Sequence, residues 1–300
     1  IMKQAERFLV INVEKSPAWS EQTFADMFVA VLSSPKDIHG EREQWDICNL
    51  ALGDPLPHIA TYNGVVITGS FRDIKDRTED PWFDPLVSLI QCAYTAGTPN
   101  LYGGCYGCQI IAHALGGVVG KNDFVFKAET LQLQPPVQQG VADNLKRKGV
   151  TAAVGDVKVI QSHGYCAEAL PSLGRGECVL LASSPSNRNE IFACGNMSNA
   201  HPRYNILACQ GHPEFGEYTH YAMAERIRPA VSAFQMCSCG PADCACDAAC
   251  AMRGKMQAGY DGLLQYGETQ ARGDKAGQTY HNVRVTDNGT HVVSAFIRDF

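Results

Sequence analysis

Two cysteines lie in a glycine-rich stretch near the middle of the chain, Tyr102-Gly103-Gly104-Cys105-Tyr106-Gly107-Cys108-Gln109. The residues before this stretch predict a short buried strand, and the apolar spacing after it predicts a helix that ends at Gly116-Gly117. A cysteine between a strand and a helix has the arrangement of a nucleophile elbow, which lifts a reactive side chain above a sheet. The alternative is a tight structural turn with no chemical role.

The placement of glycines favours Cys105 over Cys108 as the candidate nucleophile. Gly103 and Gly107 lie two positions on either side of Cys105, and glycine lets the backbone bend tightly because it has no Cβ. Cys108 has bulkier residues at the same spacing. Cys105 would also lie at a helix N-terminus, where the helix field favours a thiolate. Cys108 would lie one turn inside the helix, which predicts a packing role.

A cysteine nucleophile needs a base, and the base needs a partner that fixes its tautomer. Among the nine histidines, His212 is the first candidate, because it follows a predicted buried strand at 205–209. Glu214 lies two residues further on and could orient the imidazole. Taken alone, Gly-His-Pro-Glu could also be an ordinary polar loop.

Two other histidines need a separate interpretation. His163, in the sequence Gln161-Ser162-His163, also follows a predicted strand and is the rival base. Its nearest following carboxylate is Glu168, so it ranks second. His113 falls on the helix after the elbow, which predicts a packing or surface role.

Attack on an amide also requires donors for the developing oxyanion. The backbone N–H of Tyr106, directly after the candidate nucleophile, is one expected donor. The second is expected from the loop at Gly69 and Ser70, because glycine lets the backbone approach a substrate closely.

Strand and helix patterns alternate around these residues. Strands are predicted at 8–13, 45–48, 64–68, 157–160, 178–182, 191–193 and 205–209, and helices at 23–32, from 82 to 90 and from 218 to 234. This alternation predicts an α/β fold with a doubly wound, mostly parallel sheet that helices cover on both faces. Functional loops in such folds lie at the carboxyl ends of the strands, where Gly69-Ser70 and Cys105 fall.

Three segments depart from this alternation. Residues 118–129 predict shorter, more polar strand-like pieces, and 132–149 predict an inserted surface loop that contains Pro135-Pro136. Five cysteines crowd into residues 237–250, but their spacing is poor for structural zinc and is better explained by a small helix, so no metal is expected. Alternating runs around 287–289 predict a hairpin.

Composition limits the partners and the compartment. The chain has 300 residues, 45% of them hydrophobic, and a net charge of −6 without a basic block, so nucleic acid is an unexpected partner. No apolar run approaches the ~20 residues of a membrane helix, so no membrane is expected. Thirteen cysteines without a signal sequence are expected to be reduced thiols in a cytoplasmic protein. No phosphate-binding glycine loop is found, and no cofactor is expected.

The stretch around Cys105, the segment 114–120 and Gly211-His212-Pro213-Glu214 together resemble the class I glutamine amidotransferase family, from about residue 8 to residue 226. The resemblance implies a flavodoxin-like domain over residues 1–235, with a small helical and hairpin extension over 236–300. It implies a triad of Cys105, His212 and Glu214 that attacks a γ-carboxamide and forms a γ-glutamyl thioester. It also implies that Gln109 and the Ser162-His163 pair contact a small-molecule substrate, either glutamine or a γ-glutamyl peptide.

Some positions depart from the family pattern. The chain has Gly69-Ser70-Phe71 where the family often has Gly-Gly-Pro, it has Gly104 before the nucleophile, and it has Tyr165 in place of a common acidic residue. In these features it is similar to the stand-alone branch that includes plant γ-glutamyl peptidases.

The activity therefore has several interpretations. Only 86 residues follow Glu214 (300 − 214), too few for a synthetase domain, so we expect a free-standing γ-glutamyl hydrolase or peptidase. One alternative is a glutaminase subunit that delivers ammonia to a separate synthetase in trans. Others are a catalytically silent regulatory protein on the same fold, and a small cysteine-elbow hydrolase or stress protein of the flavodoxin-like superfamily.

Overall fold

The computed structural model describes residues 5–15, 23–33, 43–75, 80–135, 158–174, 177–199 and 203–215. Its helices and strands are, in chain order, β1 (Glu6–Ile11), α1 (Thr23–Leu32), β2 (Glu43–Cys48), the 3-10 helices η1 (Leu50–Leu52) and η2 (Ile59–Thr61), β3 (Gly64–Ile67), α2 (Phe83–Ala96), β4 (Asn100–Gly104), α3 (Tyr106–Ala114), β5 (Val118–Thr130), β6 (Gln132–Leu133), β7 (Lys158–Ala169), β8 (Cys178–Ser183), β9 (Ile191–Cys194) and β10 (Ile206–Cys209).

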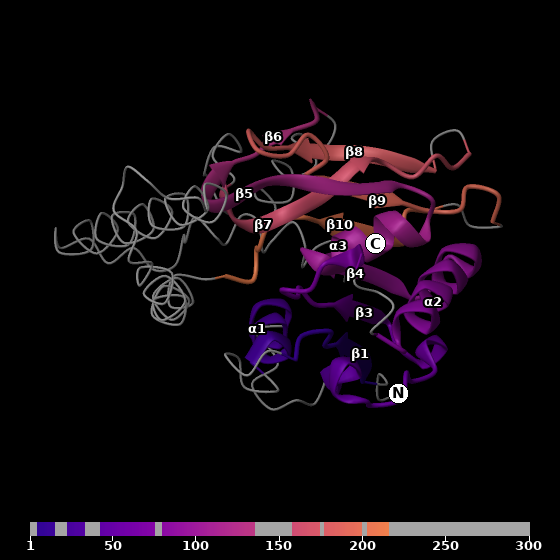
Figure 1. Cartoon of the computed structure of the whole chain (residues 1–300). Coiled ribbons are helices and arrows are strands. Elements are labelled where there is room, and N and C mark those ends of the chain that lie inside the picture. The colour runs from indigo at the N-terminus through magenta and orange to yellow at the C-terminus, as the bar shows by residue number, and fades with distance from the viewer. Residues whose placement is uncertain are drawn as a thin grey trace, which may run out of the picture.

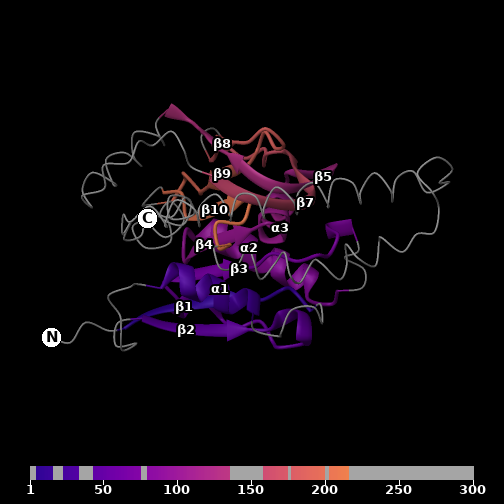
Figure 2. The ribbon, with the colours of Figure 1, turned by 90° about the vertical axis from the view of Figure 1, so that its left-hand side faces the viewer.

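Within the described residues, eight strands form one sheet in the order β2-β1-β3-β4-β10-β9-β8-β6. Neighbouring strands from β2 to β10 run parallel, whereas β9, β8 and β6 extend the sheet in antiparallel pairs. Figures 1 and 2 show α1 on one side of this sheet and α2 and α3 on the other. The predicted α/β fold, with a mostly parallel sheet and helices on both faces, is therefore confirmed.

Alternating side chains of the central strands separate the core into two layers. Phe8 and Val10 of β1 lie in a buried cluster with Phe28 of α1. Leu9 and Ile11 lie in a second cluster, which includes the buried residues of α2 and α3. Because successive strand residues point to opposite faces, a continuous apolar run such as β1 packs against helices on both sides.

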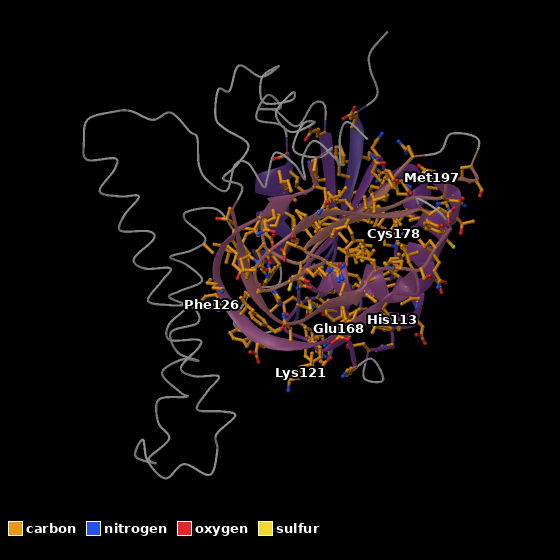
Figure 3. All side chains as sticks on the ribbon, turned by 90° about the horizontal axis from the view of Figure 1, so that it is seen from above. His113, Lys121, Phe126, Glu168, Cys178 and Met197 are labelled. Carbon is orange, nitrogen blue, oxygen red and sulfur yellow. The ribbon has the colours of Figure 1, made fainter. Side chains whose placement is uncertain are left out.

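A two-stranded antiparallel ribbon of β5 and β7 packs against α3 (Figure 1). Seen from above, Lys121 and Glu168 lie together toward one end of this ribbon, and Phe126 lies toward the other (Figure 3). The shorter pieces expected at 118–129 are instead one long strand, with shifts in register between Val118 and Val119 and between Lys121 and Val125. These irregularities account for the broken sequence pattern.

Two further expectations are corrected by strand pairing. His163 does not follow a strand but lies inside β7, because Ser162 and His163 continue the pairing with Phe126 and Val125. Residues 132 and 133 do not begin a loop but form β6, which pairs with Ala182 and Ser183 of β8. The rest of the expected insertion, the helix at 218–234, the domain boundary at 235 and the cysteine-rich tail lie outside the described residues.

None of the helices in the described ranges is long and apolar enough to cross a membrane. In the same ranges, no three His, Cys, Asp or Glu side chains gather closely enough to hold a metal ion.

Candidate active site

Cys105 is the one residue between β4 and α3. Its φ of 50° lies in the left-handed region, which a residue with a Cβ rarely adopts, so the backbone is strained at this cysteine. Gly103 and Gly107, two positions before and after Cys105, have no room for a side chain. An added Cβ would lie 2.5 Å from the Gly107 carbonyl oxygen if placed on Gly103, and 2.4 Å from the Ile67 carbonyl oxygen if placed on Gly107. The local geometry is that of a nucleophile elbow.

The strand that leads to His212 lies directly beside the strand that leads to Cys105. β10 and β4 are parallel neighbours, with Cys209 opposite Gly104, so the loops after both strands leave the sheet at one edge. The Cys105 N–H donates a hydrogen bond to the Cys209 carbonyl oxygen at 2.8 Å. His212 is held on its other side by β7, because its backbone N–H donates to the Ile160 carbonyl oxygen at 2.8 Å.

The side chains of His212 and Glu214 form a buried pair. The distance from His212 Nδ1 to Glu214 Oε1 is 2.7 Å, and the two residues are 3% and 1% exposed. Gly69 locates this pair relative to the cysteine: a Cβ added there would lie 3.3 Å from Cys105 Cβ and 3.4 Å from His212 Cε1. The cysteine and the imidazole therefore border the same glycine.

The electrostatics of this pair favour a charged imidazole. Burial on its own would lower the pKa of His212, but the Glu214 carboxylate and the Cys105 sulfur outweigh burial and raise this pKa to about 10. The imidazole Nε2 is buried and lacks a well-aligned hydrogen bond among the described residues. It is thus available to the sulfur or to a substrate.

Phe215 supports the imidazole from one face. Its ring is stacked on that of His212, with centroids 4.1 Å apart and an angle of 3° between the planes. Phe215 is fully buried in a small cluster with Phe24, Phe126 and Ile160. The imidazole plane is therefore fixed by stacking as well as by Glu214. The sequence interpretation did not include this residue.

The loop expected to supply an oxyanion donor is tied down by Glu14, a residue that the sequence interpretation missed. Glu14 Oε2 accepts hydrogen bonds from Ser70 Oγ at 3.0 Å and from the Phe71 N–H at 2.7 Å. The Ser70 hydroxyl is therefore directed to a carboxylate, and the backbone groups near Gly69 are left as the candidate oxyanion donors of this loop. The other expected donor, Tyr106, is the first residue of α3. Glu14 lies shortly after β1, at the carboxyl end of a buried strand, which is the signal that could have identified it.

Of the two β7 residues implied as substrate contacts, Ser162 lies beside the cysteine. The Ser162 carbonyl oxygen is 3.9 Å from Cys105 Sγ. His163 is 4% exposed, and its Nε2 lies 3.1 Å from Gln161 Oε1. Burial, together with the charge of His212, lowers the pKa of His163 to about 4, so this imidazole is neutral at physiological pH.

Gln109 is brought to the site, but its amide nitrogen is engaged within the protein. Gln109 Nε2 donates to the Tyr165 carbonyl oxygen at 3.0 Å and to Gln210 Oε1 at 3.3 Å. Gln210 in turn donates from its Nε2 to Cys105 Sγ at 3.7 Å. Gln210 lies two residues before His212 but carried no signal of its own, because the contact depends on the pairing of β4 with β10.

A family model described as glutamine amidotransferase class-I matches residues 45–225, more than half of the chain and most of the site. The chain belongs to this family. It is 24% identical to gamma-glutamyl peptidase 2 of Arabidopsis thaliana over 234 residues, which cover 76% of this chain and 83% of that protein. It is 25% identical to gamma-glutamyl peptidase 3 of the same plant over 236 residues, which cover 76% of this chain and 84% of that protein.

The fold of this class I amidotransferase is also that of a solved relative. A crystal structure of a glutamine amidotransferase from Thermotoga maritima superposes with a TM-score of 0.62 and 15% sequence identity, covering 99% of this chain and 100% of that one. At this identity the likeness establishes the fold alone.

A buried carboxylate, Glu190, organises the loop before His212 in this amidotransferase. Its Oε1 accepts hydrogen bonds from the Gly211 N–H at 2.8 Å and from Gln161 Nε2 at 2.9 Å, and its Oε2 accepts from Ser184 Oγ at 3.2 Å. Burial raises the pKa of Glu190, while these hydrogen bonds act in the opposite direction. Glu190 stands directly before β9, and its sequence context gave no sign of this role.

The second cysteine of the elbow helix has a different environment. Cys108 is fully buried among the apolar side chains between α3 and the sheet. Burial raises its pKa well above the ordinary value of a thiol. A neutral thiol in the core is a poor nucleophile.

Proposed function

We propose that this class I amidotransferase is a cysteine-dependent enzyme that hydrolyses or transfers a γ-glutamyl amide through a γ-glutamyl thioester on Cys105. One observation carries the proposal. His212 is paired with Glu214 at 2.7 Å, and it borders the same glycine as the strained elbow cysteine. This is the arrangement of nucleophile, base and orienting carboxylate that acyl transfer requires.

In the proposed mechanism, His212 takes the proton of Cys105 and the thiolate attacks the γ-carbonyl carbon. The oxyanion of the tetrahedral intermediate accepts hydrogen bonds from the Tyr106 N–H and from the backbone near Gly69 and Ser70, each worth roughly 3–4 kcal/mol. The intermediate collapses, the C–N bond breaks, and protonated His212 gives its proton to the leaving amine. Water, deprotonated by His212, then cleaves the thioester to release the γ-carboxylate.

The raised pKa of His212 supports the first step. Because this pKa is about 10, His212 is a strong enough base to hold, at neutral pH, the proton that it takes from Cys105. The orienting contact from Glu214 to Nδ1 leaves Nε2 for the proton transfers. Gly69 is adjacent to both side chains, so a carbonyl held against this glycine would lie next to the sulfur.

For the substrate, we propose a γ-glutamyl peptide rather than free glutamine, hydrolysed without ATP and without a synthetase partner. Two relatives that this chain matches over most of their length carry the name gamma-glutamyl peptidase. Ser70 and Tyr165, which depart from the usual amidotransferase residues, lie next to Gly69 and on β7, the segments that border the candidate nucleophile. A small molecule is then the only partner that the reaction needs.

A substrate screen tests this proposal. Purified protein is incubated with glutamine, glutathione and γ-glutamyl dipeptides, and free glutamate, ammonia and released amine are measured, with Cys105→Ser as the control. At least one γ-glutamyl peptide should be hydrolysed faster than glutamine. If every peptide is inert and glutamine is hydrolysed only after a second protein is added, the chain is a trans-acting glutaminase. If no substrate is turned over and no thioester forms, it is a silent member of the family.

A further inference from the structure

The sulfur of Cys105 receives a hydrogen bond from a side chain outside the candidate triad. Gln210 Nε2 lies 3.7 Å from Cys105 Sγ, and Gln210 is fully buried. The contact arises because Gln210 directly follows β10 while Cys105 directly follows β4, its parallel neighbour. Gln210 is also fixed through its backbone, since its N–H donates to the Glu190 carbonyl oxygen at 2.9 Å.

The direction of this hydrogen bond is set by a chain of contacts that begins at a carbonyl group. The Tyr165 carbonyl oxygen can only accept, so Gln109 must present its amide nitrogen to it, at 3.0 Å. The same nitrogen donates to Gln210 Oε1 at 3.3 Å, which places the oxygen of the Gln210 amide toward Gln109. The nitrogen of that amide therefore points to Cys105.

We propose that Gln210 is a catalytic residue that donates a hydrogen bond to the Cys105 thiolate, and that Gln109 is the positioning residue that orients it. The inference rests on the proposed role of Cys105 as nucleophile. A buried amide donor favours the charged form of the group to which it donates. Gln210 and His212 thus stabilise the thiolate together, one as a neutral donor and the other as a cation.

The surroundings of the sulfur support this division of roles. Among the described residues, the titratable groups that interact with Cys105 include His212, from the loop after β10, and Cys108, from α3. Glu214 lies behind the imidazole, and β7 contributes the Ser162 carbonyl oxygen, 3.9 Å from the sulfur. That carbonyl can accept from a thiol but repels a thiolate. Gln210 is therefore a neutral side chain that favours the charged form of the sulfur over the thiol.

The test measures how the alkylation rate of Cys105 by iodoacetamide depends on pH, followed by mass spectrometry of the modified residue. It uses the full chain and the same substitution at three positions: Gln210→Met, Gln109→Met and the remote control Gln91→Met. Methionine keeps the length and flexibility of glutamine and removes its donor. Gln91 also donates to a carbonyl, that of Ala114 at 3.0 Å, but far from the site.

Gln210→Met should raise the pH midpoint of alkylation by about one to two pH units, since a hydrogen bond to a charged group has this strength. Gln109→Met should raise the midpoint less, and Gln91→Met should leave it in place. A purely structural role would change the maximal rate or the melting temperature and not the midpoint. If the midpoint of Gln210→Met equals that of Gln91→Met, the donor role is wrong.

Two further outcomes separate the parts of the inference. If Gln210→Met does not fold, Gln109→Met decides, because it removes the orienting contact and leaves Gln210 intact. In that case an unchanged midpoint in Gln109→Met overturns the inference as a whole; where Gln210→Met folds, it overturns only the orienting role of Gln109. Because alkylation needs no substrate, the result is independent of the proposed function. If the midpoint of Gln210→Met is raised and every γ-glutamyl peptide is inert, this inference stands and the proposed function fails. If a peptide is hydrolysed and the midpoint is unchanged, the proposed function stands and this inference fails.

Discussion

Nδ1 of His212 and Oε1 of Glu214 lie 2.7 Å apart, in a site where both side chains are almost completely buried. A carboxylate this close fixes the tautomer of the imidazole and favours its charged form. Phe215, stacked on the same ring, fixes its plane. The imidazole is therefore held from two directions, and Glu214 leaves its Nε2 for chemistry.

We predict that Cys105→Ser lowers γ-glutamyl hydrolysis by about 10⁴-fold or more, because the nucleophile itself is lost. Cys108→Ser should retain most of the activity and lower the melting temperature, because a hydroxyl replaces a buried core thiol. Steady-state kinetics and thermal unfolding measure the two effects. A glutamine-directed electrophile should label Cys105. An adduct found on Cys108 would show that the elbow geometry identifies the wrong cysteine as the nucleophile.

His212→Ala should abolish formation of the acyl-enzyme, whereas Glu214→Ala should be about tenfold to a hundredfold less damaging, because orientation matters less than the base. Glu214 raises the pKa of His212, so its removal should also move the alkaline limit of activity to lower pH. Rapid-quench detection of the thioester and a pH profile of kcat/KM provide the measurements. Equal losses in both variants, with the same alkaline limit as the wild type, would contradict the assigned roles.

Glu14→Gln should lower kcat by about tenfold or more with a smaller change in KM, because its carboxylate holds the loop that we propose to contribute to the oxyanion site. Ser70→Ala is the matched variant. It removes the hydrogen bond from Ser70 Oγ to Glu14 and keeps the one from the Phe71 N–H, so it should cost less. If Glu14→Gln changes KM alone, the loop serves in substrate binding and not in transition-state stabilisation.

His163 should make the folded state sensitive to mild acid. Its folded-state pKa is lowered to about 4, against an ordinary value of 6.5, by burial and by the nearby charge of His212, with Glu129 acting in the opposite sense. As pH falls from about 6.5 to about 4, the unfolded state takes up this proton before the folded state does. The stability that neutral His163 contributes to the folded state is therefore present above pH 6.5 and is lost as pH falls from about 6.5 to about 4.

The variant His163→Gln isolates this effect. Between pH 7 and pH 4 its free energy of unfolding should fall less than that of the wild type, by roughly 2–3 kcal/mol. Urea unfolding at fixed temperature measures both proteins. Identical pH dependences would mean that His163 is not neutral in the folded state.

The amino-acid sequence by itself determined the local parts of the site. The strained turn at Cys105 follows from two glycines whose positions leave no room for a Cβ, and this constraint is visible in the spacing alone. Glu214 can reach His212 because only one residue, Pro213, separates them. The parallel strands were equally predictable, since continuous apolar runs such as β1 need a helix layer on each side.

Only the tertiary structure decided which distant residues meet. The pairing of β10 with β4 places Gln210 against the sulfur of Cys105. The pairing of β1 with β3 places Glu14, just after β1, against Ser70, just after β3. The long strand β7, which the polar residues around His163 concealed, exists because β5 supplies its hydrogen-bond partners. A local sequence pattern predicts burial and turns. The partner of a buried polar group depends on the order of the strands in the sheet, which the sequence pattern alone does not predict.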